Sequence, residues 1–200
     1  MTIMLDQPTA TEELSAEEYT LLLRTAEELD TPEGFKAELI GGKIVVSPWT
    51  HPSYMRAMRL LRQRFQEHAP QGHIADTSPF LFTFPTARRA YGPDVYVAEE
   101  HAFDEEVRHV DGEALSLVAE LTSRSTRDAD WRDKLVTYGR HVPVYLLVDM
   151  QVRQATAFWE PSEHGYRSRH TVSFGEPLYV PEPFGFELET TGFARAEGAR

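Results

Sequence analysis

The stretch LSLVAELTSRSTRDADWRDKLVTYGRHVPVYLLVDM, residues 115–150, decides which fold the sequence predicts. Two apolar runs, LSLVAEL (115–121) and VPVYLLVDM (142–150), have the length and the polar boundaries of buried strands. Between them, residues 128–141 carry apolar side chains at helical spacing. Two neighbouring strands connected through a helix lie parallel, and the helix covers one face of their sheet. The stretch therefore predicts a parallel crossover unit in an α/β domain.

An acid stands inside the first of these apolar runs. Glu120 has Leu117, Val118 and Leu121 as close neighbours, and on a strand it shares a face with Val118 and Thr122. Burying an ionised carboxylate is costly unless a partner or a metal ion compensates for it. Glu120 is therefore the strongest single indication that this chain carries chemistry.

Two other acids and one lysine occupy comparable places. Asp94 opens the apolar run of GPDVYVA, Glu38 lies in AELI, and Lys134 lies in the predicted helix. Each also has an ordinary interpretation, since Glu38 could face solvent and Asp94 could be a turn residue. Lys134 could be a solvated lysine that pairs with Asp130 one helical turn earlier. The joint pattern is more informative than any one member.

The three acids have the chemistry of a divalent-cation site. Carboxylate and carbonyl oxygens are the ligands that hard cations such as Mg²⁺ and Mn²⁺ prefer. A bound cation can activate water and neutralise the charge that builds up on phosphorus. A nearby lysine can orient the nucleophile or stabilise the same charge. Two or three oxygens from Glu38, Asp94 and Glu120 could therefore complete such a site for phosphodiester hydrolysis, with Lys134 as the assisting cation.

The N-terminal third predicts two helices and a hairpin. Residues 15–29 read as a helix with Ser15 as its N-cap. Residues 35–48 read as two strands joined by a turn at Gly41-Gly42. A second helix is predicted over 51–70, with an apolar stripe of Met55, Met58, Leu61 and Phe65.

The remainder predicts short strands around the crossover unit. Residues 99–114 are acidic and polar, which favours a solvated connection with a helical turn. We expect one mixed α/β domain over residues 15–190, with flexible tails at 1–14 and 191–200. The further predicted strand segments are HIADT (73–77), FLFTFP (80–85), QATAFWEP (154–161), GYRSRHTV (165–172) and EPLYVP (176–181).

The charge of the chain argues against broad, non-specific binding of nucleic acid. There are 32 Asp and Glu residues against 20 Lys and Arg residues, which gives a net charge of −12. Proteins that neutralise phosphates usually present a basic face. The best local basic patch in the sequence lies on the helix predicted over 51–70 and consists of Arg56, Arg59, Arg62 and Arg64. The alternative interpretation is an ordinary solvated helix face.

Several classes of protein are excluded or disfavoured by composition. The chain has no cysteine, so disulfides and thiolate metal sites are excluded. The eight histidines lack the spacing of a zinc site. No apolar stretch has the length of a membrane span, and the N-terminus lacks the pattern of a signal peptide. We therefore expect a soluble, cytoplasmic protein without a membrane partner.

Three blocks of the sequence resemble a known nuclease family. They are AELIGGKIVVSP (37–48), GPDVYV (92–97) and the block that runs from Val118 to Asp149. Together they are similar to the Uma-type restriction endonucleases of the PD-(D/E)xK superfamily, particularly to actinobacterial members. The resemblance covers residues 17–188 and implies a central mixed β-sheet flanked by helices, as in restriction endonucleases.

The resemblance also implies roles for single residues. Asp94 matches the first metal-binding acid of the family, Glu120 the second, and Glu38 an acid that could complete the metal site. Many superfamily members carry a lysine two residues after the second acid, where this chain has Thr122. Lys134, from the following helix, matches the lysine of this family instead.

Two positions depart from the family pattern. Ala37 stands where many relatives have tyrosine, and Tyr54 stands where many have histidine. Neither departure removes a proposed ligand, but Tyr54 leaves any role of that histidine without a counterpart.

The first hypothesis for function is a Mg²⁺- or Mn²⁺-dependent endonuclease acting on DNA. Superfamily members often pair to cut both strands, so a homodimer is a further expectation. An alternative is a catalytically inactive binding or regulatory module with the nuclease fold, which the acidic composition favours. A third is a small β-rich ligand-binding domain in which the acids form only salt bridges.

Overall fold

The computed structural model describes residues 14–48, 52–122 and 126–193. The central sheet of this part of the chain has six strands in the order β11-β10-β9-β8-β6-β3. It is mixed, because β8 and β9 run parallel while the other neighbouring strands run antiparallel. Its strands are β3 (His73–Asp76), β6 (Val95–Glu99), β8 (Leu115–Thr122), β9 (Val144–Asp149), β10 (Gln154–Trp159) and β11 (Ser168–Ser173).

The predicted crossover unit is confirmed. Strand β8 pairs with β9 in parallel, from Leu117 opposite Val144 to Thr122 opposite Asp149. The connection contains one continuous helical segment, made of α3 (Arg127–Ala129), the π-helical turn η4 (Asp130–Lys134) and α4 (Leu135–His141). Every residue of β8 and β9 is buried, as expected for strands covered on both faces.

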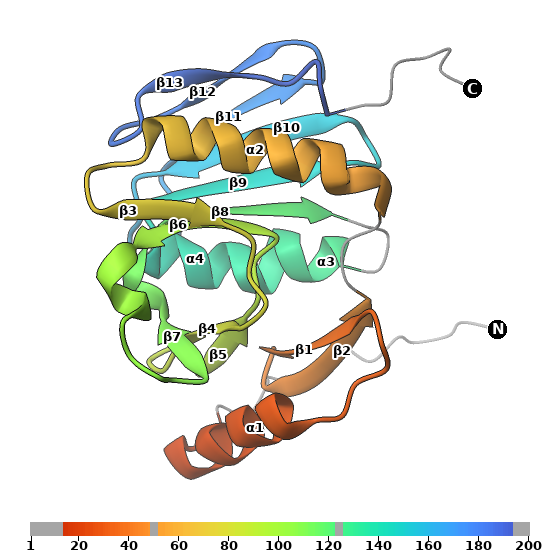
Figure 1. Cartoon of the computed structure of the whole chain (residues 1–200), viewed down its shortest axis with the longest axis vertical. Coiled ribbons are helices and arrows are strands. Elements are labelled where there is room, and N and C mark those ends of the chain that lie inside the picture. The colour runs from red at the N-terminus through yellow and green to blue at the C-terminus, as the bar shows by residue number, and fades with distance from the viewer. Residues whose placement is uncertain (1–13, 49–51, 123–125, 194–200) are drawn as a thin grey trace, which may run out of the picture.

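A second sheet lies beyond α4, and Figure 1 shows it below the helix, with α1 at the lower end. Its strand order is β2-β1-β5-β4-β7, and β1 and β2 form the predicted antiparallel hairpin. Gly41 and Gly42 make its turn with φ of +56° and +76°, a conformation that glycine adopts without strain. The strands are β1 (Phe35–Ile40), β2 (Lys43–Pro48), β4 (Leu81–Phe84), β5 (Arg89–Tyr91) and β7 (His109–Asp111).

Helix α1 (Ala16–Glu28) covers this second sheet through Tyr19 and Leu23. The predicted N-cap is confirmed: the Glu18 amide donates to Ser15 Oγ at 3.2 Å, and the Ser15 amide donates to the Glu18 carboxylate at 2.7 Å. This reciprocal capping box satisfies two amides that the first helical turn would otherwise leave free.

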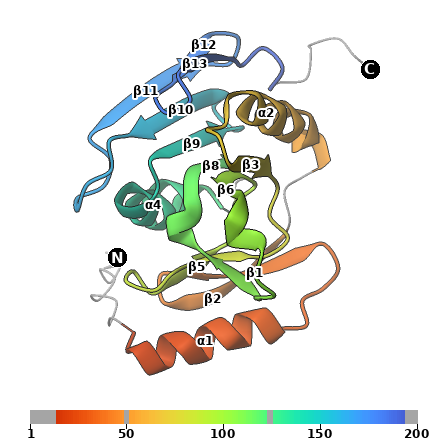
Figure 2. The same ribbon diagram turned by 60° about the vertical axis from the view of Figure 1, so that its left-hand side comes forward.

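Helix α2 (Met55–His68) packs on the face of the central sheet opposite α4 (Figure 2). Of the predicted stripe, Met58, Leu61 and Phe65 are buried against the sheet. Met55, the first residue of the helix, belongs to the predicted stripe but is 41% exposed. Strands β12 (Pro177–Val180) and β13 (Phe186–Glu189) form a two-stranded sheet whose buried side chains join the same apolar cluster.

The predicted α/β fold, a mixed sheet flanked by helices, is confirmed, but some elements were missed. Strands β5 and β7 have only three residues each, too short to show a period-two pattern. The acidic segment 99–114 contains β7 between two 3-10 turns, η2 (Glu100–Phe103) and η3 (Gly112–Ala114). A third 3-10 turn, η1 (Pro52–Tyr54), precedes α2.

The described elements run from Ala16 to Glu189, inside the domain predicted over 15–190. The limits of that domain stay a prediction, because the tails predicted at 1–14 and 191–200 lie almost wholly outside the described residues. No helix in the described part of the chain is long and apolar enough to cross a membrane.

Candidate active site

The crossover helix and strand β8 bring Glu120 and Lys134 together. Alternation along β8 turns Ala119 and Leu121 toward the α2 face, so Glu120 faces the crossover helix with Val118. Lys134 Nζ lies 3.0 Å from Glu120 Oε1, and both side chains are buried. The helix therefore supplies a lysine to the acid, as the family resemblance implied.

Lys134 is the meeting point of three carboxylates. Besides Glu120, Lys134 Nζ lies 3.1 Å from Glu38 Oε1 and 3.4 Å from Asp130 Oδ1. Glu38 comes from β1 in the second sheet, so the cluster joins the two sheets across the crossover helix. The structure thus brings together three of the four predicted site residues around one ammonium group.

Asp130 belongs to this cluster and lies in the π-helical turn η4. Asp130 and Lys134 are the two ends of η4, and both are 2% exposed. Single π turns inside helices are frequent at functional sites. The helix begins at Arg127, and its first turn carries Asp130 into the interior.

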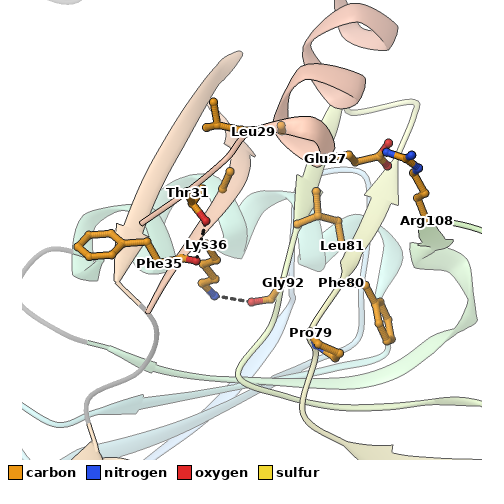
Figure 3. A pocket seen from close by; sticks show the side chains of 12 residues that line it. Glu27, Leu29, Thr31, Phe35, Lys36, Pro79, Phe80, Leu81, Gly92 and Arg108 are labelled. Carbon is orange, nitrogen blue, oxygen red and sulfur yellow. Dashed lines mark hydrogen bonds between the residues drawn. The ribbon is translucent and has the colours of Figure 1, made fainter. Parts of the chain in front are cut away.

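Glu38 is held by further contacts on its other side. The Gly92 amide donates to Glu38 Oε1 at 2.9 Å, and Lys36 Nζ lies 3.5 Å from Glu38 Oε2. Lys36 also donates to the Gly92 carbonyl oxygen, as Figure 3 shows. Lys36 was missed in the sequence, although it is two residues before Glu38 and therefore on the same face of β1.

A pocket of about 410 Å³ lies on the outer side of Lys36. Figure 3 shows Phe35 and Lys36 on one wall, Pro79 and Phe80 on the other, and Gly92 between them. The pocket therefore adjoins the cluster through Lys36 and Gly92, the two residues that also hold Glu38.

Asp94 lies at the start of β6, next to the end of β8. Its Oδ2 accepts a hydrogen bond from the Leu121 amide at 2.8 Å. Because Leu121 follows Glu120, this bond holds the two acids close together, and the charge of Asp94 raises the pKa of Glu120. Asp94 is 9% exposed, which makes it the least buried of the four predicted site residues.

The cluster is rich in negative charge for a buried site. Four carboxylates face two ammonium groups, which leaves two negative charges when all are ionised. These acids are Glu38, Asp94, Glu120 and Asp130, and the cations are Lys36 and Lys134.

The pKa values follow from this charge balance. Burial raises the pKa of Glu120 to about 8, helped by Asp94 and Asp130 and opposed by Lys134. Burial also raises the pKa of Asp130, again against Lys134. For Glu38, burial is outweighed by Lys134 and Lys36, which lower its pKa. Burial opposes the charge of Lys134, but Glu120, Glu38 and Asp130 raise its pKa well above the ordinary value.

Buried tyrosines line the helix side of the cluster. Tyr138 donates a hydrogen bond to Glu120 Oε1 at 3.1 Å, and the Tyr91 ring lies 5.6 Å from Lys134 Nζ. Tyr145 donates to the backbone carbonyl of Asp130 at 3.2 Å. The fully buried ring of Tyr138 packs against Tyr91 and Tyr145.

The donor set fits a hard divalent cation in its chemistry. All four acids offer carboxylate oxygens, and Asp130 Oδ1 accepts no hydrogen bond among the described residues. A dication would balance the two excess negative charges. In the geometry described, however, no group of three or more acidic or histidine side chains has a metal-holding arrangement. The Lys134 ammonium group occupies the place where the carboxylates converge.

Thr122 marks where superfamily members carry their lysine. It is fully buried, and its Oγ1 has no hydrogen-bond partner among the described residues. Tyr54, at the position of the family histidine, packs against the apolar cluster under α2. Ser123 and Ser125, which follow Thr122 in the chain, lie outside the described residues.

Comparisons with known proteins agree with this architecture. Residues 16–191 match the sequence model of the Uma2 family, described as "Putative restriction endonuclease". A crystal structure described as "a putative nuclease belonging to DUF820", from Anabaena variabilis, superposes with a TM-score of 0.66 at 16% sequence identity. The superposition covers 86% of this chain and 96% of that chain, so the two share a fold. No curated protein matches the chain.

Proposed function

Because the chain belongs to the Uma2 restriction endonuclease family, we propose that it is a metal-dependent endonuclease that hydrolyses phosphodiester bonds in DNA. One observation carries the proposal: a buried, acid-rich cluster lies beside the start of β6 and the end of β8, with the Lys134 side chain among its carboxylates. Buried ionisable groups with strongly shifted pKa values are typical of catalytic sites.

Asp94, Glu120 and Glu38 would hold a divalent cation, Mg²⁺ or Mn²⁺. When bound, the ion would supply an activated water molecule and neutralise charge on the phosphate. The excess negative charge of the cluster supports this role, because carboxylates that repel one another gain from a cation. Asp130, which the sequence did not offer as a ligand, adds to that charge.

Lys134 would serve as a fixed cation. Its raised pKa keeps the ammonium group protonated, so it cannot accept a proton from water. It can donate hydrogen bonds, orient the attacking water molecule and stabilise charge on the phosphate oxygens. Glu38 and Asp130 would then position Lys134 through their ion pairs.

The test is cleavage of supercoiled plasmid with Mg²⁺ or Mn²⁺, beside the variants Asp94→Asn and Glu120→Gln. Both substitutions keep the shape of the side chain and remove an ionisable carboxyl group. We expect metal-dependent nicking by the parent protein and a loss of at least about a hundredfold in each variant. Glu187→Gln is a matched control, because Glu187 is an exposed acid on β13.

Cleavage that survives in Asp94→Asn or Glu120→Gln would contradict the assignment of the site. Cleavage that falls equally in Glu187→Gln would point to a general effect of charge. Size measurement in solution tests the expected homodimer, which stays a prediction.

A second candidate is a binding module without catalysis. It is favoured by the burial of the cluster, since Glu38, Glu120 and Lys134 are each at most 2% exposed and already pair with one another. Titration calorimetry with Mn²⁺ separates the two candidates. Binding that Glu120→Gln weakens supports the endonuclease, and absence of binding at millimolar Mn²⁺ supports the binding module.

A further inference from the structure

A second pocket, of about 520 Å³, lies on the outer side of the crossover helix. Its walls come from the outer face of η4 and α4, the β4–β5 turn, and the β1–β2 turn at Gly42. Four arginines and one acid line it, so that it carries three net positive charges in a chain whose net charge is −12. These residues are Arg88, Arg89, Arg132, Arg140 and Asp133.

Arg89 forms the fixed wall of this arginine pocket. Its Nε lies 3.1 Å from each carboxylate oxygen of Asp133, and its Nη1 donates to the carbonyl oxygens of Ala87 and Arg88. Asp133 also accepts a hydrogen bond from the Tyr91 hydroxyl. The pocket is therefore built on the same helix and the same tyrosine that border the candidate active site.

The charge of the other three arginines is not balanced by a direct ion pair in the described part of the chain. Within the described ranges, none of Arg88, Arg132 and Arg140 forms an ion pair with an acid. Arg88 acts on one acid only through its charge. That acid is Glu18, whose pKa is lowered mainly by hydrogen bonds with Ser15 and further by the charge of Arg88. An unpaired cation beside a concave surface is a ready partner for an anion.

Arg132 and Arg140 form a row along the helix. They lie eight residues apart with Val136 between them, so all three point to one side, away from Lys134 and Tyr138. Eight residues of helix span roughly 12 Å, and phosphates of one DNA strand rise by about 3.4 Å each. The row is long enough to contact more than one backbone phosphate.

Arg88 has an unusual backbone for its residue type. Its φ is +54°, in the left-handed region where glycine is favoured. The turn between β4 and β5 therefore presents an arginine at a position where glycine would be less strained.

We propose that the arginine pocket binds backbone phosphates of a nucleic acid and holds the strand next to the candidate active site. The planar guanidinium group matches the geometry of a phosphate with two parallel hydrogen bonds. The proposal rests on the proposed function. It also explains how an acidic protein could bind DNA, by concentrating cations on the side of the sheet that carries the site.

The arginines of α2, which the sequence offered as the basic patch, lie on the other side of the central sheet. Figure 2 shows α2 and α4 on opposite faces of that sheet. Arg56, Arg59 and Arg62 are exposed there, whereas Arg64 pairs with Glu67. They provide a control that removes the same charge from the far face.

The experiment measures binding of a fluorescent DNA duplex in EDTA, so that no cleavage occurs, over about 50 to 200 mM salt. The triple variant Arg88→Gln, Arg132→Gln, Arg140→Gln is compared with Arg56→Gln, Arg59→Gln, Arg62→Gln. We expect the pocket variant to bind at least about tenfold more weakly and to lose about 2 to 3 from the salt slope. The α2 variant should lose less than about twofold.

Equal losses in both triple variants, or no binding of the parent protein to DNA, would overturn the proposal. Thermal stabilisation by inorganic phosphate or ATP without duplex binding would also overturn it, because it would assign the pocket to small anions. Pocket-dependent binding by a parent protein that does not cleave would refute the proposed function and leave this inference standing.

Arg88→Gly gives a second readout that separates binding from folding. Glycine relieves the left-handed backbone, so this variant should unfold at the same or a higher temperature while it binds DNA more weakly. Weaker binding together with a lower unfolding temperature would mean that misfolding causes the loss of DNA binding. That outcome would contradict a direct role of Arg88 in binding.

Discussion

The two faces of strand β8 divide the molecule into an apolar side and a charged side. On one face, Leu117, Ala119 and Leu121 pack under α2 in a cluster made of apolar side chains. On the other face, Val118 and Glu120 alternate with them, and Glu120 reaches a cluster of acids and lysines under the crossover helix. Neighbouring residues of one strand thus enter environments that differ in both polarity and charge.

The comparison shows how the fold can tolerate a costly site. Burial of apolar area stabilises by roughly 25 cal/mol per Å², and the α2 face supplies this without a charge to desolvate. The α4 face contains buried ions, for which attraction offsets desolvation only partly. We infer that apolar burial on the α2 face offsets the desolvation cost of the charged groups buried on the α4 face.

The largest expected effect on stability comes from removing the lysine on the charged side of β8. Lys134→Met removes the cation that three buried carboxylates share, so we expect a loss of about 3 to 5 kcal/mol in the free energy of unfolding at neutral pH. The loss should shrink in acid, where the carboxylates take up protons. Urea unfolding at several pH values measures it.

Lys43→Met is the matched control, because Lys43 is exposed on β2 and should lose no more than about 0.5 kcal/mol. Adding Glu120→Gln to Lys134→Met should restore part of the stability. A Lys134→Met protein as stable as the parent would contradict the ion-pair assignment.

The next effect on stability comes from a cavity on the apolar side of β8. Leu61 is fully buried under α2, and Leu61→Ala should cost about 2 to 5 kcal/mol through lost burial and a cavity. The metal-dependent activity of the folded fraction should stay unchanged, since Leu61 lies across the sheet from Glu120. Activity that falls at temperatures where the variant remains folded would contradict the separation of the two faces.

The next prediction concerns one proton on Glu120. Burial, with Asp94 and Asp130, raises its pKa to about 8 against the attraction of Lys134, so the folded state keeps a proton that the unfolded chain releases near its ordinary value of 4.5. Stability should therefore fall as pH rises from about 4.5 through 8. Thermal unfolding across this range measures the fall, and Glu120→Gln should flatten it. If Mn²⁺ binds the ionised carboxylate, it should reverse this loss of stability above pH 8. If the pH dependence of stability is unchanged in Glu120→Gln, the proton belongs to another group.

The smallest effect separates two buried tyrosines. Tyr138→Phe removes the hydrogen bond to Glu120 and should cost about 1 kcal/mol. Tyr166→Phe removes a bond to the carbonyl oxygen of Val142 and should cost a similar amount. Only Tyr138→Phe should change the pH dependence of unfolding, and the same change in Tyr166→Phe would show that the cluster is not local.

Much of the fold could be predicted from local patterns in the sequence. Period-two and helical periodicities indicated α1, the β1–β2 hairpin, α2 and the parallel β8–β9 crossover. The chemistry of single residues was also visible, because Glu120 in an apolar run requires compensation. These features depend on neighbours along the chain, and the amino-acid order contains them directly.

Which charged residues meet was decided by the tertiary structure. Glu38 reaches Lys134 only because the second sheet packs against the crossover helix. The i,i+4 spacing of Asp130 and Lys134 was visible in the sequence, but the burial of both side chains depends on what the helix packs against. The arginine pocket likewise joins the β4–β5 turn to the outer face of α4. Local periodicity says which face of an element is buried, but not which distant face it meets. That choice depends on the packing of whole elements, where burial of apolar area fixes the position of the charges.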